Sequence, residues 1–191
     1  MSRLTIYIDP GCPWAWRTSL WAREIERLGA VQLDWKLFSL AEVNRDPEIV
    51  MDPAPASVAH RTLLLARREF GQKAFDKLYL ALGHARWDNR GDIRDPAVIA
   101  AACTEAGLPG DLVERALADE STNEEVLAEH LESVERYRAF GVPWLVADDS
   151  PIGFYGPVIS EVPSGDAALT LWEHTSWFLT QPAFFEIKRP H

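Results

Sequence analysis

The first 37 residues contain a strand pattern, a helix pattern and a second strand pattern in immediate succession, and no other feature constrains the fold as strongly. Residues 3–9 alternate apolar and polar side chains, and a proline and a glycine then end the alternation. A helical pattern starts near Pro13 and stops at Gly29, and residues 31–37 alternate again. This order predicts a βαβ unit, in which a right-handed crossover joins two parallel strands.

Helical periodicity dominates residues 44–140. This segment opens with a linker that contains three prolines: Pro47, Pro53 and Pro55. The helical pattern is interrupted at four places: Gly71, 89–92, 107–110 and 121–123. We therefore expect four or five packed helices, one of them starting at a capping box with Ser121 or Thr122.

Strand composition returns at residues 141–146, and a turn separates it from a second short run at residues 152–155. These two runs predict an antiparallel hairpin, and apolar spacing predicts a final helix from about Ser164 to Leu179. The order of elements is that of an α/β thioredoxin-like fold split by helices. We expect two parts: a thioredoxin-like domain of residues 1–43 and 141–191, and a helical insertion of residues 44–140.

The net charge limits the kinds of binding partner, and the N-terminal sequence indicates the cellular compartment. A net charge of −10 argues against binding to nucleic acid or to an anionic membrane, because both require clustered Lys and Arg. Residues 111–135 hold nine acidic side chains and one basic one, Arg115, and we interpret them as the solvated face of surface helices. The N-terminus shows no export signal and no run of eighteen apolar residues occurs, so we expect a cytoplasmic protein.

Two cysteines, Cys12 and Cys103, do not form the framework of a disulfide-stabilised secreted protein. Cys103 lies in an alanine-rich helical stretch and is expected to be buried. The five histidines are scattered without the spacing of a metal site, so we expect no metal: His60, His84, His130, His174 and His191.

Cys12 lies between the first strand and the first helix. A thiol reacts as its thiolate, and the backbone N–H groups at a helix start stabilise that anion. The position therefore predicts a nucleophile with a lowered pKa. The alternative is that Cys12 is a small buried hydrophobic residue.

Pro143 opens the third predicted strand directly after Val142. A proline there is either an ordinary strand start or a cis-proline with a function. In the second case the backbone of Val142, next to Cys12, would pair with an extended thiol substrate.

Four segments carry a resemblance to a known family: "DPGCPWAW", "GVPWLV", "FYGPVISEVPSG" and "LW". In this order, with helices between the first two, the chain resembles the DsbA-like thioredoxin-fold family. More narrowly, it is similar to the cytosolic branch of mycothiol-dependent reductases, which includes nitroreductases with a Cys-Pro-Trp-Cys site.

The resemblance implies that Cys12 is the catalytic nucleophile. It also implies that the remaining candidate residues bind the substrate or a small thiol: Pro13, Trp14, Asn44, Val142, Pro143, Gly156, Pro157 and Ser160. The implied co-substrate is mycothiol, with glutathione as the alternative, and the implied substrates are disulfides or small electrophiles such as nitroaromatics or quinones. A mycoredoxin-type or thioredoxin-type protein is the implied reductant.

Ala15 departs from the family pattern, because dithiol enzymes have their resolving cysteine there. Cys12 would then form a mixed disulfide that a thiol from solution must release, which is a monothiol mechanism. Cys103 as a distant resolving cysteine is an alternative, and an engineered alanine is another.

Two further hypotheses stay open. Kappa-class glutathione transferases and 2-hydroxychromene-2-carboxylate isomerases share the split fold and have a single Ser or Cys at the position of Cys12, where it activates a bound thiol. The other hypothesis is that the chain is a non-catalytic thiol-binding relic of a redox enzyme.

The tryptophans fall into two groups by their place in the pattern. Those on apolar faces are expected in the core: Trp16, Trp21, Trp35 and Trp172. Those at the ends of elements are expected to line a cleft between the thioredoxin-like part and the helices: Trp14, Trp87 and Trp144.

Overall fold

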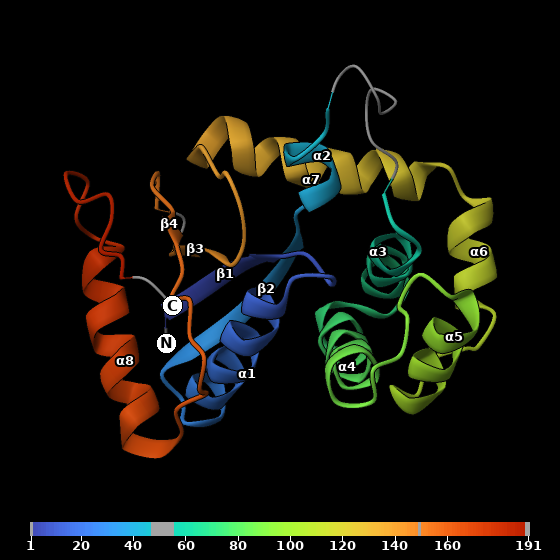
Figure 1. The fold of residues 1–191 in the computed structure, drawn as a ribbon, viewed down its shortest axis with the longest axis horizontal. Helices are drawn as coiled ribbons and strands as arrows, with labels where there is room; N and C mark the ends of the chain where they lie inside the picture. The colour runs from blue at the N-terminus through green and yellow to red at the C-terminus, as the bar shows by residue number, and fades with distance from the viewer. Residues whose placement is uncertain (1, 47–55, 149, 190–191) are drawn as a thin grey trace.

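The computed structural model describes residues 2–46, 56–148 and 150–189, and within these ranges it is an α/β structure around one four-stranded sheet (Figure 1). The strands are β1 (Ser2–Ile8), β2 (Val31–Leu37), β3 (Trp144–Ala147) and β4 (Phe154–Tyr155). Their order is β2-β1-β3-β4, with β1 parallel to β2 and antiparallel to β3. Ile6 is thereby paired with Trp35 on one side and Leu145 on the other. The predicted βαβ unit and hairpin are confirmed.

The first helix and the last helix follow the sequence pattern closely. Helix α1 (Pro13–Arg27) connects β1 to β2, and α8 (Gly165–Phe178) packs against α1. Trp21 joins the two helices, since its indole N–H donates to the carbonyl of Ala168 at 3.1 Å and its ring packs on Trp172. Figure 1 shows α8 beside the sheet at the end opposite to α3–α6.

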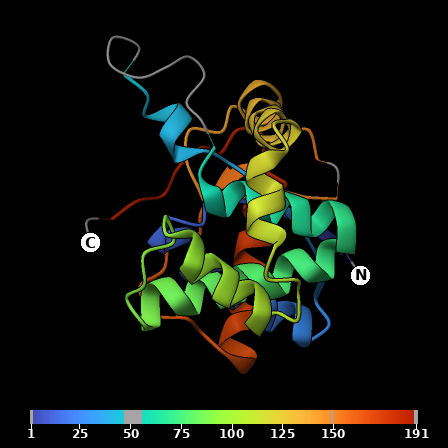
Figure 2. The same cartoon turned by 90° about the vertical axis from the view of Figure 1, so that its right-hand side faces the viewer.

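Helices also form most of the described chain between β2 and β3. They are α2 (Leu40–Val43), α3 (Val58–Phe70), α4 (Gln72–Gly83), the π-helical segment η1 (His84–Asp88), α5 (Pro96–Glu105), α6 (Leu112–Ala118) and α7 (Ser121–Tyr137). Figure 2 shows α5 and α6 in front of α3 and α4, with α7 almost end-on above them. The sequence pattern predicted α3 to α7 but missed α2 and η1, and the three linker prolines lie outside the described residues.

The start of α7 differs from the predicted capping box. The helix begins at Ser121, but its N-cap residue, Glu120, makes no capping bond with its side chain. Instead, the carboxylate of Asp119 accepts hydrogen bonds from the backbone N–H and the hydroxyl of Ser121, at 3.0 and 2.6 Å. Asp119, two residues before Ser121, therefore performs the role that we assigned to Ser121 or Thr122.

The acidic run is only partly a solvated face, and this prediction was wrong for two glutamates of α7. Glu129 forms an ion pair with Arg67 of α3 at 2.5 Å and accepts the backbone N–H of Leu37 at 2.8 Å. Glu132 forms an ion pair with Lys36 of β2 at 2.5 Å. These contacts fasten α7 to the outer edge of β2, where unpaired backbone groups would otherwise be open.

The core contains three of the four tryptophans predicted there, because Trp16, Trp21 and Trp35 are buried, while Trp172 is half-buried against it. Trp144 is also buried, with 5% of its surface exposed, and packs on the backbone of Gly153. The prediction that Trp144 lines an open cleft was therefore wrong. Within the described ranges, no helix combines the length and the apolar content needed to cross a bilayer.

Candidate active site

Cys12 lies in a tight turn between β1 and α1 that Asp9 builds. The carboxylate of Asp9 accepts the backbone N–H of Gly11 at 2.8 Å, and its carbonyl accepts the backbone N–H of Cys12 at 3.0 Å. Such a side-chain bond to the backbone two residues later is a common use of Asp in turns. Pro13 then starts α1, where its missing N–H costs nothing.

The thiol of Cys12 has polar partners on both sides. Its Sγ accepts the backbone N–H of Ala15 at 3.4 Å, as the N-cap of α1, and it donates to the carbonyl of Val142 at 3.5 Å. The peptide bond from Val142 to Pro143 is cis. Residues 130 positions apart in the sequence thus meet at one sulfur atom.

Only 5% of the surface of Cys12 is exposed, and this burial controls its titration. Burial raises the pKa of the Cys12 thiol, the N–H groups of Ala15 and Trp14 act in the opposite direction, and the negative charge of Asp9 raises it further. The net direction is upward, so the predicted lowering of the pKa was wrong. Cys12 is buried, as in the alternative hypothesis. Unlike an ordinary core cysteine, however, it makes hydrogen bonds to the backbone of Ala15 and Val142.

A second loop completes this side of the site. The peptide bond between Gly156 and Pro157 is also cis, and the backbone N–H of Gly156 donates to the carbonyl of Pro143 at 2.9 Å. The hydroxyl of Thr18 on α1 donates to the carbonyl of Pro157 at 2.7 Å. The loop after β4 is therefore tied both to the Val142-Pro143 segment and to α1.

The other predicted residues lie at the rim or farther out. Pro13 is exposed and Trp14 is half-buried, with the guanidinium of Arg17 5.7 Å from its ring centre. Ser160 is exposed on the loop after β4. Asn44 is the exposed C-cap residue of α2, and its amide donates to Leu40 of the same helix.

The structure adds residues that the sequence did not single out. Asp9 and His60 lie buried behind the turn, and Tyr155 of β4 is close enough to Cys12 for the thiol charge to affect its titration. Phe140, with 65% of its surface exposed, packs against Tyr155 with ring centres 5.2 Å apart. Asp9 was visible as the acidic residue before the Pro-Gly break, whereas His60 and Phe140 had no signal in the sequence.

Cys103 lies in the last turn of α5 and is completely buried, as predicted. Burial alone raises the pKa of its thiol to about 11. Both cysteines are free, and among the described residues no three His, Cys, Asp or Glu side chains gather as a metal site would require.

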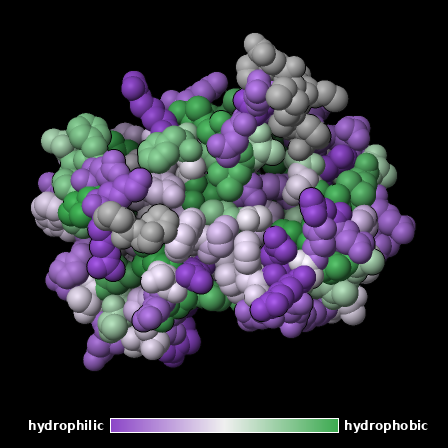
Figure 3. Space-filling model, viewed as in Figure 1, coloured by the Kyte–Doolittle hydropathy of each residue, from purple (hydrophilic) through white to green (hydrophobic). Residues whose placement is uncertain are grey.

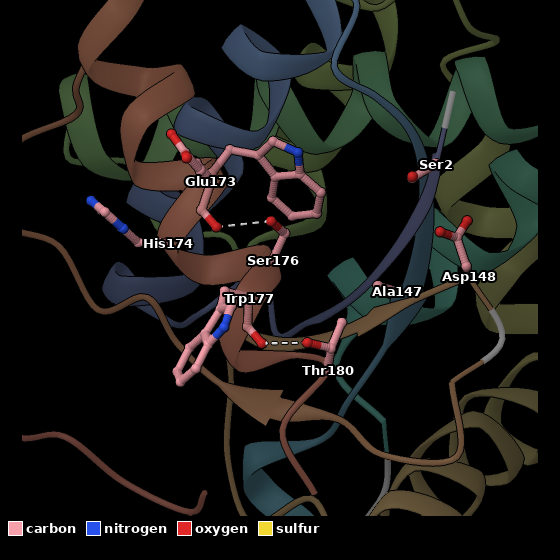
Figure 4. Close-up of a pocket in the computed structure, with 9 residues that line it drawn as sticks. Ser2, Ala147, Asp148, Glu173, His174, Ser176, Trp177 and Thr180 are labelled. Carbon is pink, nitrogen blue, oxygen red and sulfur yellow. Dashed lines mark hydrogen bonds between the residues drawn. The ribbon is translucent and has the colours of Figure 1, made fainter.

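A hollow of about 480 Å³ lies at the other end of the sheet, lined by the start of β1, the end of β3 and α8 (Figure 4). Glu173, Ser176 and Trp177 of α8 line it from one side, and Ser2 from another. Because β1 leads from Ser2 toward Cys12, about seven residues of strand, or roughly 20 Å, separate the hollow from the thiol. The hollow is not part of the candidate active site.

The sheet order, the inserted helices and a cysteine at the start of α1 facing the Val142-Pro143 segment together define a DsbA-like protein of the thioredoxin fold. The chain belongs to the Rv2466c-like family, described as mycothiol-dependent nitroreductase Rv2466c, whose model matches residues 11–189. The uncharacterized protein Rv2286c of Mycobacterium tuberculosis is 30% identical over 194 residues, which covers 100% of this chain and 83% of the relative.

Solved structures share the fold at low identity. A probable DsbA oxidoreductase from Streptomyces coelicolor has a TM-score of 0.67 at 18% identity, with 97% of this chain and 94% of that chain covered. The cytosolic disulfide reductase DsbM from Pseudomonas aeruginosa has a TM-score of 0.63 at 15% identity, with 92% and 98% covered. A 2-hydroxychromene-2-carboxylate isomerase has a TM-score of 0.63 at 16% identity, with 92% and 94% covered. The predicted α/β, DsbA-like fold is confirmed.

Proposed function

We propose that the chain is a cytoplasmic thiol-dependent oxidoreductase in which Cys12 is the only catalytic sulfur. The observation that carries the proposal is the position of this sulfur between the N–H of Ala15 and the carbonyl of Val142, with alanine where a second cysteine would stand. The family supports mycothiol as the co-substrate. Glutathione is the alternative, since a structural relative, DsbM, is described in a complex with GSH.

The first step would be attack of the Cys12 thiolate on a disulfide. A substrate that pairs with the backbone of Val142 would replace the bond between Cys12 and the Val142 carbonyl, and the N–H groups of Ala15 and Trp14 would stabilise the thiolate. Attack forms a mixed disulfide between Cys12 and one half of the substrate and releases the other half as a thiol. A second small thiol, or a mycoredoxin-type protein, would then attack the mixed disulfide, restore the Cys12 thiol and leave as the new disulfide.

Small planar electrophiles are the other substrate class that we propose. Cys12 and one mycothiol together would supply two electrons and two protons to a quinone, which becomes a hydroquinone while the two sulfurs form a mixed disulfide. Phe140, Tyr155 and Trp14 provide aromatic surface near Cys12 for such a ring. Figure 3 shows that apolar side chains are exposed in the middle of one face of the molecule, between the α8 side and the helices of the insertion.

A transferase or isomerase function is the second candidate, and one observation favours it. The raised pKa keeps Cys12 protonated at neutral pH, so its S–H group would donate a hydrogen bond to the sulfur of a bound thiolate instead of attacking a disulfide. Ala15 fits this candidate as well, because no second cysteine is needed.

Intact-protein mass spectrometry separates the candidates. The reduced wild-type chain, Cys12→Ser and the control Cys103→Ala are each incubated with oxidised mycothiol and, separately, with oxidised glutathione. One adduct on the wild type and on Cys103→Ala, lost in Cys12→Ser and removed by added thiol, supports the oxidoreductase and identifies the thiol. No adduct but tight binding of the reduced thiol supports the transferase or isomerase. No adduct and no turnover supports the non-catalytic relic.

A further inference from the structure

A carboxylate and an imidazole are buried together directly behind the turn that carries Cys12. Asp9 and His60 are both more than nine-tenths buried, and the Nε2 atom of His60 lies 3.5 Å from an Asp9 oxygen. The same Asp9 oxygen accepts the backbone N–H of Leu40 at 2.8 Å, and the other oxygen accepts that of Gly11. Asp9 therefore connects the turn before Cys12 to the start of α2 and to His60.

His60 reaches this place from α3, which belongs to the helical segment between β2 and β3. Its Nε2 lies 2.9 Å from the carbonyl of Phe38, and since a carbonyl only accepts, Nε2 bears a hydrogen. Its Nδ1 lies 2.7 Å from the hydroxyl of Ser57, the N-cap residue of α3. Both ring nitrogens are thus held, and the ring orientation follows from the start of α3.

We propose that His60 is a positioning residue for Cys12, acting through Asp9: the buried histidine neutralises the aspartate that shapes the nucleophile's turn, so that Cys12 faces a balanced pair instead of a bare negative charge. The proposal rests on the proposed function in that it takes Cys12 as the nucleophile. It means that the helical segment supplies part of the electrostatic environment of the thiol, and does more than cover the site.

The charges agree with this geometry. Burial lowers the pKa of His60, but Asp9 and the carbonyl of Phe38 together raise it by more, and the net direction is upward. Burial raises the pKa of Asp9, while His60 and the N–H groups of Leu40 and Gly11 lower it, and the net direction is downward. Both groups are therefore charged together near neutral pH, as a buried pair requires.

Other titratable groups face the pair from the neighbouring elements. His130 of α7 and Glu42 of α2 act on the same region, and Tyr79 of α4 interacts with both Asp9 and Cys12. His130 has a lowered pKa, chiefly through burial, and accepts the backbone N–H of Ser39 at 3.3 Å. It is a buried neutral histidine close to the same loop, which makes it a matched control for His60.

The test is the pH at which Cys12 becomes reactive. Iodoacetamide labelling of Cys12 is followed by peptide mass spectrometry from pH 6 upward on the wild type and on variants with one or both partners changed: H60Q, D9N, D9N/H60Q and H130Q. H60Q leaves Asp9 unpaired beside the thiol, so the midpoint moves to higher pH and labelling below the midpoint slows roughly tenfold, as a shift of about one pH unit implies. D9N removes the negative charge, and its midpoint moves to lower pH.

The double variant decides whether His60 acts through Asp9. We expect D9N/H60Q to have the same midpoint as D9N, because His60 has no charge to neutralise once Asp9 is gone. H130Q is expected to keep the wild-type midpoint even where its melting temperature falls. If H60Q fails to fold, an NMR titration of the His60 ring in the wild type and in D9N carries the test: a pKa of His60 that falls in D9N supports the coupling of the two charges, and an unchanged pKa overturns the proposal.

Equal midpoints in H60Q, H130Q and the wild type would overturn the proposal, since His60 would then be structural only. This labelling assay needs no substrate. Midpoints that shift as expected in a chain that forms no mixed disulfide with either thiol would support the role of His60 while rejecting the proposed oxidoreductase function.

Discussion

The start of α1 and the last turn of α5 each bury a cysteine, yet the two surroundings differ in nearly every other respect. Cys12 has an N–H donor, a carbonyl acceptor and a carboxylate around it, whereas Cys103 lies in an apolar, alanine-rich helix. Burial raises the pKa of both thiols, but only at Cys12 do hydrogen bonds to the sulfur counteract the rise. The comparison teaches that the polar groups around a buried thiol, more than its exposure, separate a candidate nucleophile from a core residue.

The two cysteines also differ in what must move to expose them. Cys12 follows the exposed Gly11 and precedes the exposed Pro13, so we expect a small displacement of the turn to uncover the sulfur. Cys103 is covered by helices that pack on both sides of α5, namely α4 and α6. Its exposure requires these helices to separate, which is a much larger opening.

The largest expected effect is therefore in the labelling rates of the two thiols in the native chain. With iodoacetamide at pH 8, we expect Cys12 to react at least about a hundredfold faster than Cys103, because Cys103 reacts only through rare opening. Labelling of Cys12 should rise with pH, near tenfold per unit, until the pH passes its raised pKa, since only the thiolate reacts. Peptide mass spectrometry over time measures both rates, and equal rates at the two sites would contradict the expected difference between the two thiols.

Restoring a second cysteine near Cys12 gives the next largest effect. Ala15 is buried and its N–H already contacts the Cys12 sulfur, so in Ala15→Cys the two sulfurs lie within one helical turn. We expect an internal disulfide, seen as a loss of two hydrogens in mass, and at least about a tenfold decrease of the mixed disulfide, because the new thiol attacks it.

Ala106→Cys is the matched control for that variant, since it adds a cysteine three residues after Cys103. We expect no internal disulfide there and an unchanged mixed disulfide at Cys12. Internal disulfides in both variants would mean that the spacing of the two cysteines, and not the surroundings of Cys12, controls the reaction.

Trp14→Ala tests the aromatic rim of the site. Trp14 is half-buried at the start of α1, so we expect the affinity for a nitroaromatic or quinone to fall roughly tenfold with little change in stability, in line with the loss of one aromatic contact. Tryptophan fluorescence or calorimetric titration measures the affinity. Trp172→Ala is the control, because Trp172 is also half-buried but lines the hollow at the other end of the sheet. Equal losses of affinity in both variants would contradict a specific role for Trp14.

Local patterns were sufficient for the elements and for the location of Cys12, but not for the contacts between distant segments. Strands β1 and β2 and helix α1 follow from periodicity and from the breaks that flank them. The hydrogen bond of Leu37 to Glu129 and that of Cys12 to the carbonyl of Val142 join residues 92 and 130 positions apart. His60 belongs to the same class, because a single histidine on an apolar helix face looks like any core position until the fold brings Asp9 to it.

The smallest expected effect is that of Cys103→Ala. The change removes one sulfur atom from a fully buried position in α5, so we expect a loss of about 1 kcal/mol in the free energy of unfolding, comparable to the loss of one core methylene. Urea unfolding measures it. Because Cys103 has no part in the proposed chemistry, the formation and the thiol-dependent release of the Cys12 adduct should keep their wild-type rates. A slower release in Cys103→Ala would give Cys103 the role of a distant resolving thiol. In that case, burial and a raised pKa without hydrogen bonds to the sulfur would no longer indicate that a cysteine is unreactive.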